Sequence, residues 1–286
     1  MTEILIDVEI CTGCGGCAAV CNVTQVYKMQ DGKAVAVSAR RCWECGQCVA
    51  VCPVDAINHS AFPLEACPQV APFLAAEVER LSIALQSRRS VRVYKTQPVP
   101  REMVEQLIQI ARSAPSAKNR QVVDWIAVDN RETIADLGRK TVTALALIAK
   151  RLRKRAEKPG VAEEELRQML ADAKSLEFLE RKQDRGEDAV FFGAPVLLMA
   201  HVPPGEFGVA DAVYAAYSLM LAAHIHGLGT CQIGYFSLAL RHNRTLRTQV
   251  GVPKGREIVL AMVLGYPQYR YRRAIPRRPH EVVWGD

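Results

Sequence analysis

The spacing of hydrophobic residues predicts most of the regular secondary structure after residue 73. Over residues 73–86 the apolar positions recur every three or four residues, which is typical of a helix with one apolar face; these positions are Leu74, Val78, Leu81 and Leu85. Further helices are predicted at residues 101–113 and 210–227. Apolar runs at residues 122–128 and 196–200 have the length of strands. These elements indicate a domain that combines helices with strands.

Residues 137–188 show a separate helical pattern. Apolar residues at helical spacing occupy two stretches, and charges of both signs surround them; the apolar positions are Leu145, Ile148, Leu152, Leu166, Leu170, Leu176 and Leu179. Pro159 and Gly160 separate the two stretches, and this pair interrupts a helix. The pattern therefore predicts a helical hairpin, which either covers a cleft or makes a solvated contact with a second subunit.

The residues before position 73 predict smaller elements. Apolar residues at 26–27 and 34–37 flank Asp31 and Gly32, which indicates a short β-hairpin. Further along, three prolines exclude a continuous helix; they are Pro63, Pro68 and Pro72. We therefore expect a first domain at residues 1–62, a linker at 63–73 and a second domain at 74–286.

Composition indicates a soluble protein whose charge is unevenly divided. The chain has 286 residues, 49% of them apolar, and no apolar stretch that we expect to cross a bilayer. Residues 1–65 contain four Lys and Arg and seven Asp and Glu, so their net charge is −3. The net charge of the whole chain is +7, so the remaining residues carry +10. Much of the excess lies on one predicted helix face at residues 139–158, as is usual for a solvated helix. Because no aromatic residues alternate with the basic ones on this face, nucleic acid is not an expected partner.

Eight of the ten cysteines form two runs with the same spacing, C-x2-C-x2-C-x3-C. The two-residue gaps let three thiolates reach neighbouring corners of one 4Fe-4S cluster, and the fourth cysteine of each run ligates the other cluster. Pro53 after the second run fits this pattern, whereas Asn22 after the first run departs from it. The expected ligand sets are Cys11, Cys14, Cys17 and Cys52 for one cluster and Cys42, Cys45, Cys48 and Cys21 for the second.

Structural zinc and disulfide bonds are the competing interpretations of these cysteines. Zinc needs four ligands, fewer than the two runs supply. Disulfides are disfavoured because no signal peptide is expected before the motif, so we predict a reducing compartment, the cytoplasm. Residues 1–62 resemble a two-cluster bacterial ferredoxin, which implies two short hairpins and two small helices. Cys67, in the linker, is predicted to be a buried thiol and not a ninth ligand.

The motifs after residue 86 resemble those of the flavin-dependent nitroreductase family. In chain order they are the basic turn at residues 87–94, the Pro-Ser-x-x-Asn-x-Gln loop at 115–121, Gly-Ala-Pro at 193–195, Gly-Thr-Cys-Gln-Ile-Gly at 229–234, Leu-Gly-Tyr-Pro at 264–267 and Ile-Pro-Arg-Arg-Pro at 275–279. The resemblance covers about residues 74–284. It implies an α+β domain with a mixed sheet flanked by helices, in an intertwined homodimer.

The resemblance also implies FMN, and the chemistry of the matching residues suits this cofactor. A flavin phosphate is dianionic, and guanidinium groups supply fixed, paired donors for it. By resemblance, the basic turn binds the phosphate, the loop comes from the second subunit to meet the ribityl chain and the ring, and the glycine-containing stretch lies beside the flavin. The expected cofactor-binding residues are Arg88, Arg89, Ser90 and Arg92 in the turn, Pro115, Ser116, Ala117, Lys118 and Asn119 in the loop, Gln232, Ile233 and Gly234 beside the ring, and Arg277 and Arg278 near the end of the chain.

Joined to the first domain, this resemblance implies an iron-sulfur flavoprotein oxidoreductase. Clusters pass single electrons to or from FMN, which exchanges a hydride with a small electrophilic substrate such as a nitroaromatic, a quinone or an activated alkene. The electron partner is either a ferredoxin-like protein or NAD(P)H, although no G-x-G-x-x-G fingerprint follows a strand. The insert at residues 137–188 would shape access to the flavin.

Two other functions remain open from the sequence alone. One is an electron-transfer subunit that relays electrons to a protein partner without a small substrate; the other is a flavin-modifying or dehalogenating member of the same superfamily. No catalytic side chain is singled out, since several side chains could donate a proton near the flavin: Tyr214, Tyr217, Tyr235, Lys118 and Cys231. His224 is predicted to be a core or interface residue and not a ligand.

Overall fold

The computed structural model describes residues 2–72, 74–205, 207–275 and 277–285. The chain forms two compact units, one comprising Met1–Leu74 with Ser116–Arg120 and the other comprising Ala75–Pro115 with Gln121–Asp286. Each unit has hydrophobic clusters of its own. Phe73, the last residue of the predicted linker, lies outside the described residues.

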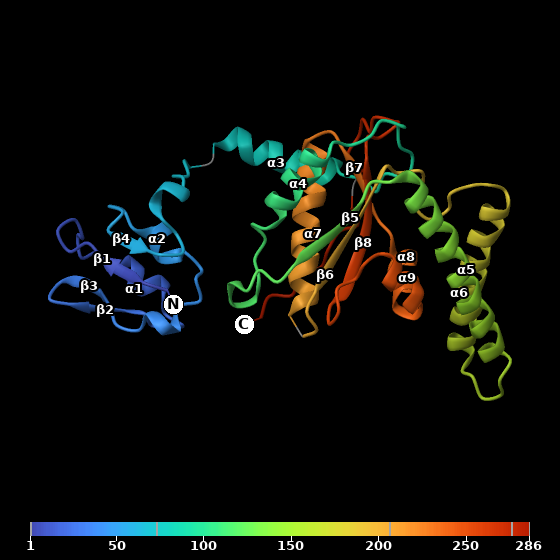
Figure 1. Cartoon of the computed structure of the whole chain (residues 1–286), viewed down its shortest axis with the longest axis horizontal. Helices are drawn as coiled ribbons and strands as arrows, with labels where there is room; N and C mark the ends of the chain where they lie inside the picture. The colour runs from blue at the N-terminus through green and yellow to red at the C-terminus, as the bar shows by residue number, and fades with distance from the viewer. Residues whose placement is uncertain (1, 73, 206, 276, 286) are drawn as a thin grey trace. The chain divides into compact units, whose positions relative to one another are not determined.

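The N-terminal unit is built from short strands (Figure 1). Strands β2 (Tyr27–Gln30) and β3 (Lys33–Ala36) form the predicted hairpin, with φ of 50° at Asp31 and 75° at Gly32, the left-handed geometry that a two-residue hairpin turn requires. The expectation of a second hairpin is wrong. Strand β1 (Ile4–Ile6) pairs instead with the distant β4 (Ile57–His59), which joins the two ends of this segment.

Two small helices confirm the other expectation for this unit. Helices α1 (Gly16–Val20) and α2 (Gln47–Val51) each lie within one cysteine run. They bury Cys17 and Cys48 in a small core that includes the side chain of Tyr27. The unit also contains the short 3-10 helices η1 (Ala39–Arg41), η2 (Leu64–Ala66) and η3 (Ala117–Asn119). Three more cysteines of the two runs, Cys21, Cys42 and Cys52, pack against this core.

The larger unit contains a four-stranded sheet with the order β5-β6-β8-β7. Its strands are β5 (Asp124–Val128), β6 (Val196–Val202), β7 (Gly229–Gln232) and β8 (Glu257–Gly265). Every neighbouring pair is antiparallel, so the mixed sheet that we expected is wrong for the described strands. Strands β6 and β7 run in the same direction, but β8 lies between them. Among the described residues, a parallel pairing is found at one isolated β-bridge, which joins Ser90 to Thr230.

Helices cover both faces of this sheet (Figure 1). Along β6, Leu197 and Met199 join one core while Val196 and Leu198 join the other, because side chains alternate between the faces of a strand. Burial on both sides explains why residues 196–200 are continuously apolar. One face packs against α4 (Arg101–Ala111) and α7 (Gly208–Ile225), and the other against α5 (Arg131–Ala156), α8 (Gly234–His242) and α9 (Arg244–Gln249).

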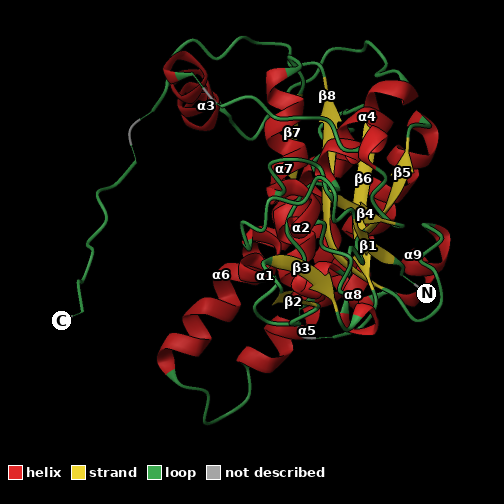
Figure 2. Ribbon diagram, turned by 90° about the vertical axis from the view of Figure 1, so that its left-hand side faces the viewer, coloured by secondary structure: helices red, strands yellow, loops and turns green. Residues whose placement is uncertain are grey.

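The predicted helical hairpin is confirmed as α5 and α6 (Glu163–Asp184), which extend away from the sheet (Figure 2). Helix α5 begins earlier than expected because the Asn130 side chain accepts a hydrogen bond from the backbone nitrogen of Thr133 at 2.8 Å, an N-cap. Ion pairs from Arg153 to Glu177 and from Arg155 to Glu165 join the two helices. That this hairpin covers the flavin cleft or contacts a second subunit stays a prediction.

Two helices of this unit bear on further predictions. Helix α3 (Ala75–Ser87) confirms the helix predicted at residues 73–86. Helix α7 is long and apolar enough to cross a membrane, by length and composition alone, so the expectation that no such stretch exists is wrong for this helix. The core helix of a soluble protein passes the same test, and Ala212 and Leu219 of α7 are fully buried against the sheet.

A close packing contact holds the start of β7 and yields the first testable prediction. A Cβ added at Gly229 would lie 2.5 Å from Val91 Cγ2 and 2.7 Å from Val91 Cβ. Because Val91 is β-branched and buried, it has little freedom to move aside. We expect Gly229→Ala to destabilise the unit by about 1–3 kcal/mol, a loss of roughly 2–4 °C in unfolding temperature per kcal/mol.

Differential scanning calorimetry of the apoprotein would measure this effect. Gly234→Ala is the matched control, because a Cβ at Gly234 meets nothing within 4 Å. Equal unfolding temperatures for the Gly229→Ala variant and the unmodified chain would contradict the prediction.

Candidate functional site

A pocket in the N-terminal unit is lined by four cysteines that come from both runs: Cys11, Cys14, Cys17 and Cys52. Apolar side chains, among them Ile6, Val54 and Ile57, form much of the remaining wall. Thiolates in an apolar shell are what a 4Fe-4S cluster needs. The residues therefore fit a cluster, and they are the first set that the spacing predicts. That they ligate one cluster stays a prediction.

The second predicted set is also gathered in one place. Burial raises the pKa of Cys42, and the nearby thiols of Cys48, Cys45 and Cys21 raise it further. Among the described residues, no group of three or more His, Cys, Asp and Glu side chains is arranged to hold a single metal ion. Because crowded thiolates repel one another, cationic iron bound between them would lower the cost of ionising all four.

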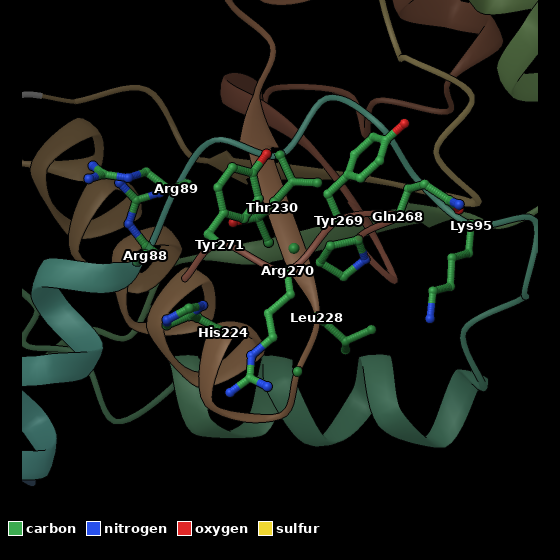
Figure 3. Close-up of a pocket in the computed structure, with 14 residues that line it drawn as sticks. Arg88, Arg89, Lys95, His224, Leu228, Thr230, Gln268, Tyr269, Arg270 and Tyr271 are labelled. Carbon is green, nitrogen blue, oxygen red and sulfur yellow. The ribbon is translucent and has the colours of Figure 1, made fainter. Parts of the chain in front are cut away.

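The larger unit contains a cavity of about 380 Å³ at the basic turn (Figure 3). Arg88 and Arg89 lie at one end of it and Lys95 at the other. Four polar atoms here are buried and have no hydrogen-bond partner among the described residues: Arg88 Nε, Arg88 Nη1, Arg89 Nη2 and Thr230 Oγ1. Burying charged donors without an acceptor is costly. The donor set therefore fits an anion such as the phosphate of FMN.

The other residues of the basic turn take different positions. Ser90 and Arg92 do not line this cavity. They lie beside Cys231. Burial raises the pKa of the Cys231 thiol, and the nearby Arg92 and Ser90 partly offset this increase. Cys231 is thus held as a buried, neutral thiol at the back of the turn.

The end of the chain also differs from the expectation. Arg277 and Arg278 are exposed and do not line the cavity, and Pro276 of the same motif lies outside the described residues. Arg270 reaches the cavity in their place. Arg270 lines the cavity because residues 268–271, which directly follow Tyr266 and Pro267 in the sequence, form part of its wall.

Sequence reasoning missed several residues of this cavity: Lys95, His224, Tyr269, Arg270 and Tyr271. His224 Nε2 lies 2.8 Å from Ser87 Oγ. Burial and the charge of Arg88 lower the pKa of His224, so the ring is neutral at pH 7. The basic and aromatic run at residues 269–273 was the one available signal, whereas nothing in the sequence connects His224 to Arg88.

Of the loop expected to meet the flavin from the second subunit, residues 116–119 belong, in their own chain, to the N-terminal unit, and Pro115 belongs to the larger unit. Asn119 Nδ2 donates to the carbonyl oxygen of Glu44 at 2.5 Å, and Lys118 Nζ lies 6.0 Å from the centroid of the Trp43 ring. Lys118 and Asn119 both have positive φ, at 55° and 53°. Left-handed backbone at residues other than glycine stores strain that is common at functional sites. The roles of Pro115, Ser116, Ala117, Lys118 and Asn119 toward FMN stay predictions.

The stretch expected beside the flavin ring lies at the end of β7. Gln232 is its last residue, and Gly234 begins α8. Both are exposed, whereas Ile233 is buried in the core. Nothing lies within 4 Å of a Cβ built at Gly234, so this position has room on its open side. Gln232 and Gly234 are placed to line an open surface, and the contact of all three residues with FMN stays a prediction.

Comparison with known families and proteins adds independent evidence. The model of the nitroreductase family matches residues 85–266, and a 4Fe-4S dicluster domain model matches residues 3–53. A 4-nitrobenzoate reductase of Pseudomonas putida is 28% identical over 212 residues, which cover 70% of this chain and 90% of that protein. Ferredoxin-3 of Desulfocurvibacter africanus is 59% identical over 34 residues, 12% of this chain and 54% of that protein.

The fold of the larger unit has a counterpart among solved structures. A nitroreductase with bound FMN from Desulfitobacterium hafniense superposes with a TM-score of 0.53 at 20% identity, over 72% of this chain and 98% of that one. At this identity the similarity concerns the fold alone. It supports the α+β architecture derived above.

Proposed function

The chain belongs to the nitroreductase family, and on this premise we propose an iron-sulfur flavoprotein oxidoreductase that couples single-electron transfer by two 4Fe-4S clusters to two-electron reduction of a small electrophilic substrate. It is an FMN-dependent oxidoreductase with an N-terminal 4Fe-4S dicluster domain. One observation carries the proposal. The same chain has a pocket lined by cysteines of both runs and a cavity with buried, unpaired guanidinium donors.

The chain's own residues have distinct roles in this proposal. The cysteine sets would hold the clusters, and the apolar wall of the pocket around Cys11 would exclude water from one of them. Arg88 and Arg89 would bind and orient the FMN phosphate through donors that are already in position, which reduces the ordering cost of binding. Neutral His224 would keep the region beside Arg88 free of a further positive charge. FMN, when bound, supplies the ability to take up electrons singly and to release two as a hydride.

The relatives favour a small-molecule acceptor over a subunit that only relays electrons to another protein. The 4-nitrobenzoate reductase and the chloronitrobenzene nitroreductase of Comamonas testosteroni are both named for nitroaromatic compounds. We therefore propose a nitroaromatic, a quinone or an activated alkene as acceptor. Reduced ferredoxin or NAD(P)H would be the donor, and the dicluster domain favours ferredoxin.

We also propose a homodimer. The side of α7 that faces away from the sheet exposes four large apolar residues within nine positions, namely Val209, Val213, Tyr214 and Tyr217. A run of this kind on one helix face marks a protein contact. A partner subunit would cover it and could bring the loop at residues 115–119 to the flavin of the first subunit.

Anaerobic purification followed by cofactor counting and a donor screen tests the proposal. We expect about eight irons and eight sulfides per chain and one FMN, with reduced ferredoxin supporting faster reduction of 4-nitrobenzoate or a quinone than NADH or NADPH does. Chains that bind no flavin, or far fewer than eight irons after anaerobic reconstitution, would refute it. The same samples with each donor omitted control for chemical reduction.

A further inference from the structure

His59 lies against one of the predicted cluster ligands. Its Nε2 is 3.4 Å from the sulfur of Cys42, a distance suited to an N–H···S hydrogen bond. The ring is 1% exposed, and its residue closes strand β4, where it pairs with Ile4 of β1. The Phe62 ring packs on it with centroids 4.9 Å apart. Strand pairing and ring packing therefore hold the imidazole in one orientation.

The hydrogen bonds of the ring assign its proton. The backbone nitrogen of Ala61 donates to His59 Nδ1 at 3.2 Å, so Nδ1 is an acceptor. In a neutral imidazole the other nitrogen then carries the hydrogen. Nε2 is therefore the donor and the Cys42 sulfur the acceptor. A histidine that only filled the core would not need this orientation toward a thiol.

The other sulfurs of the two sets also make hydrogen-bond contacts. In the first predicted set, Cys52 accepts from the backbone nitrogen of Ala56 at 3.2 Å. Cys42 also accepts from a backbone nitrogen, that of Glu44 at 3.3 Å, and receives the His59 contact in addition. In the second set, Thr24 Oγ1 lies 3.0 Å from Cys21 Sγ, so both of these side-chain contacts fall on the second set, and His59 supplies the imidazole donor.

We propose that His59 is a positioning residue that raises the reduction potential of the cluster held by Cys21, Cys42, Cys45 and Cys48. Hydrogen bonds to the sulfurs are among the factors that set such potentials. One-electron reduction adds one electron to the cluster, and His59 keeps its proton. The added negative charge strengthens the Nε2–H···S bond, so the reduced state gains more from it than the oxidised state does.

The proposal rests on the assignment of these four cysteines to one cluster, and its test separates the two ideas. His59→Met removes the donor while keeping an apolar side chain of similar size, and His59→Gln offers an amide nitrogen close to the position of Nε2. Phe62→Leu alters the packing around the ring without touching the donor. For each anaerobically reconstituted full-length protein, iron is counted and both cluster midpoints are measured by EPR-monitored redox titration.

We expect His59→Met to lower one midpoint by about 59 mV, which is a tenfold change in a one-electron equilibrium, and to leave the other unchanged. His59→Gln should recover at least half of this shift, and Phe62→Leu should cause little. Unchanged midpoints in His59→Met at full iron content overturn the role of His59, as does an equal shift in Phe62→Leu. An unmodified protein with far fewer than eight irons refutes the cluster assignment itself.

A measurement on the unmodified protein covers the case in which His59→Met does not assemble its clusters. With histidine labelled by 15N, pulsed EPR of the reduced protein should show a weak nitrogen coupling that disappears in His59→Gln, whose amide is unlabelled. The absence of this coupling in the unmodified protein overturns the proposal.

Discussion

Replacing Cys48 with alanine is expected to lower ferredoxin-driven turnover by more than about 100-fold, because even changes to residues behind the metal ligands cost 10–100-fold in metal affinity or activity. Cys48 is 7% exposed and belongs to the small core of the N-terminal unit. Its replacement removes one of the four proposed ligands and opens a space inside that core. Iron content should fall by about four per chain.

Two measurements separate this effect from general unfolding. Flavin reduced chemically in the Cys48→Ala protein should still reduce the acceptor, because the larger unit has its own cores. Cys67→Ala is the matched control: Cys67 packs at the edge of the same small core but lies outside both runs. We expect it to keep about eight irons and full turnover. A Cys48→Ala protein with full iron content and ferredoxin-driven activity would exclude Cys48 as a ligand.

Local patterns explain why much of the fold was predictable. The Asp31-Gly32 turn, the leucine spacing of the helical hairpin and the apolar strand at residues 196–200 each depend on residues close in sequence. The pairing of β1 with β4 was missed because its strands are separated by 50 residues, and neither carries a turn signal that links it to the other. The mixed sheet was implied by the family resemblance, and the sequence could not correct it, because periodicity does not report the direction of a strand.

The candidate site shows the same limit at the level of single residues. Arg88 and Arg89 were predicted, since a cluster of guanidinium groups is itself a signal for phosphate. His224 was not expected at the cavity, because its position there depends on how the end of α7 packs beside the basic turn. Arg270 lines the cavity and Arg277 and Arg278 do not, and this difference likewise depends on the path of the chain after β8. The sequence indicated the kind of ligand that the site would bind, but it did not indicate which distant segments would meet there.

Replacing Arg88 with methionine is expected to weaken FMN binding by about 10–150-fold, since a hydrogen bond to a charged group is worth about 1.5–3 kcal/mol. Two of its donor atoms, Nε and Nη1, are buried and have no hydrogen-bond partner in the part of the chain that the structure describes, so the phosphate is the acceptor that would satisfy them. Methionine keeps the apolar stem and removes the charge. Fluorescence titration of the apoprotein with FMN would measure the dissociation constant.

Stability and control variants sharpen this prediction. In the absence of FMN, Arg88→Met should leave the unfolding temperature equal or higher, because it removes a buried, unpaired charge; saturating FMN should then stabilise the variant less than the unmodified protein. Arg112→Met is the control for lost positive charge, since Arg112 is exposed and its side chain donates to Gln109 of its own helix turn. Arg277→Met tests the alternative from the sequence: a loss of affinity as large as that of Arg88→Met would place the phosphate near the end of the chain, and an unchanged affinity would support the cavity around Arg88.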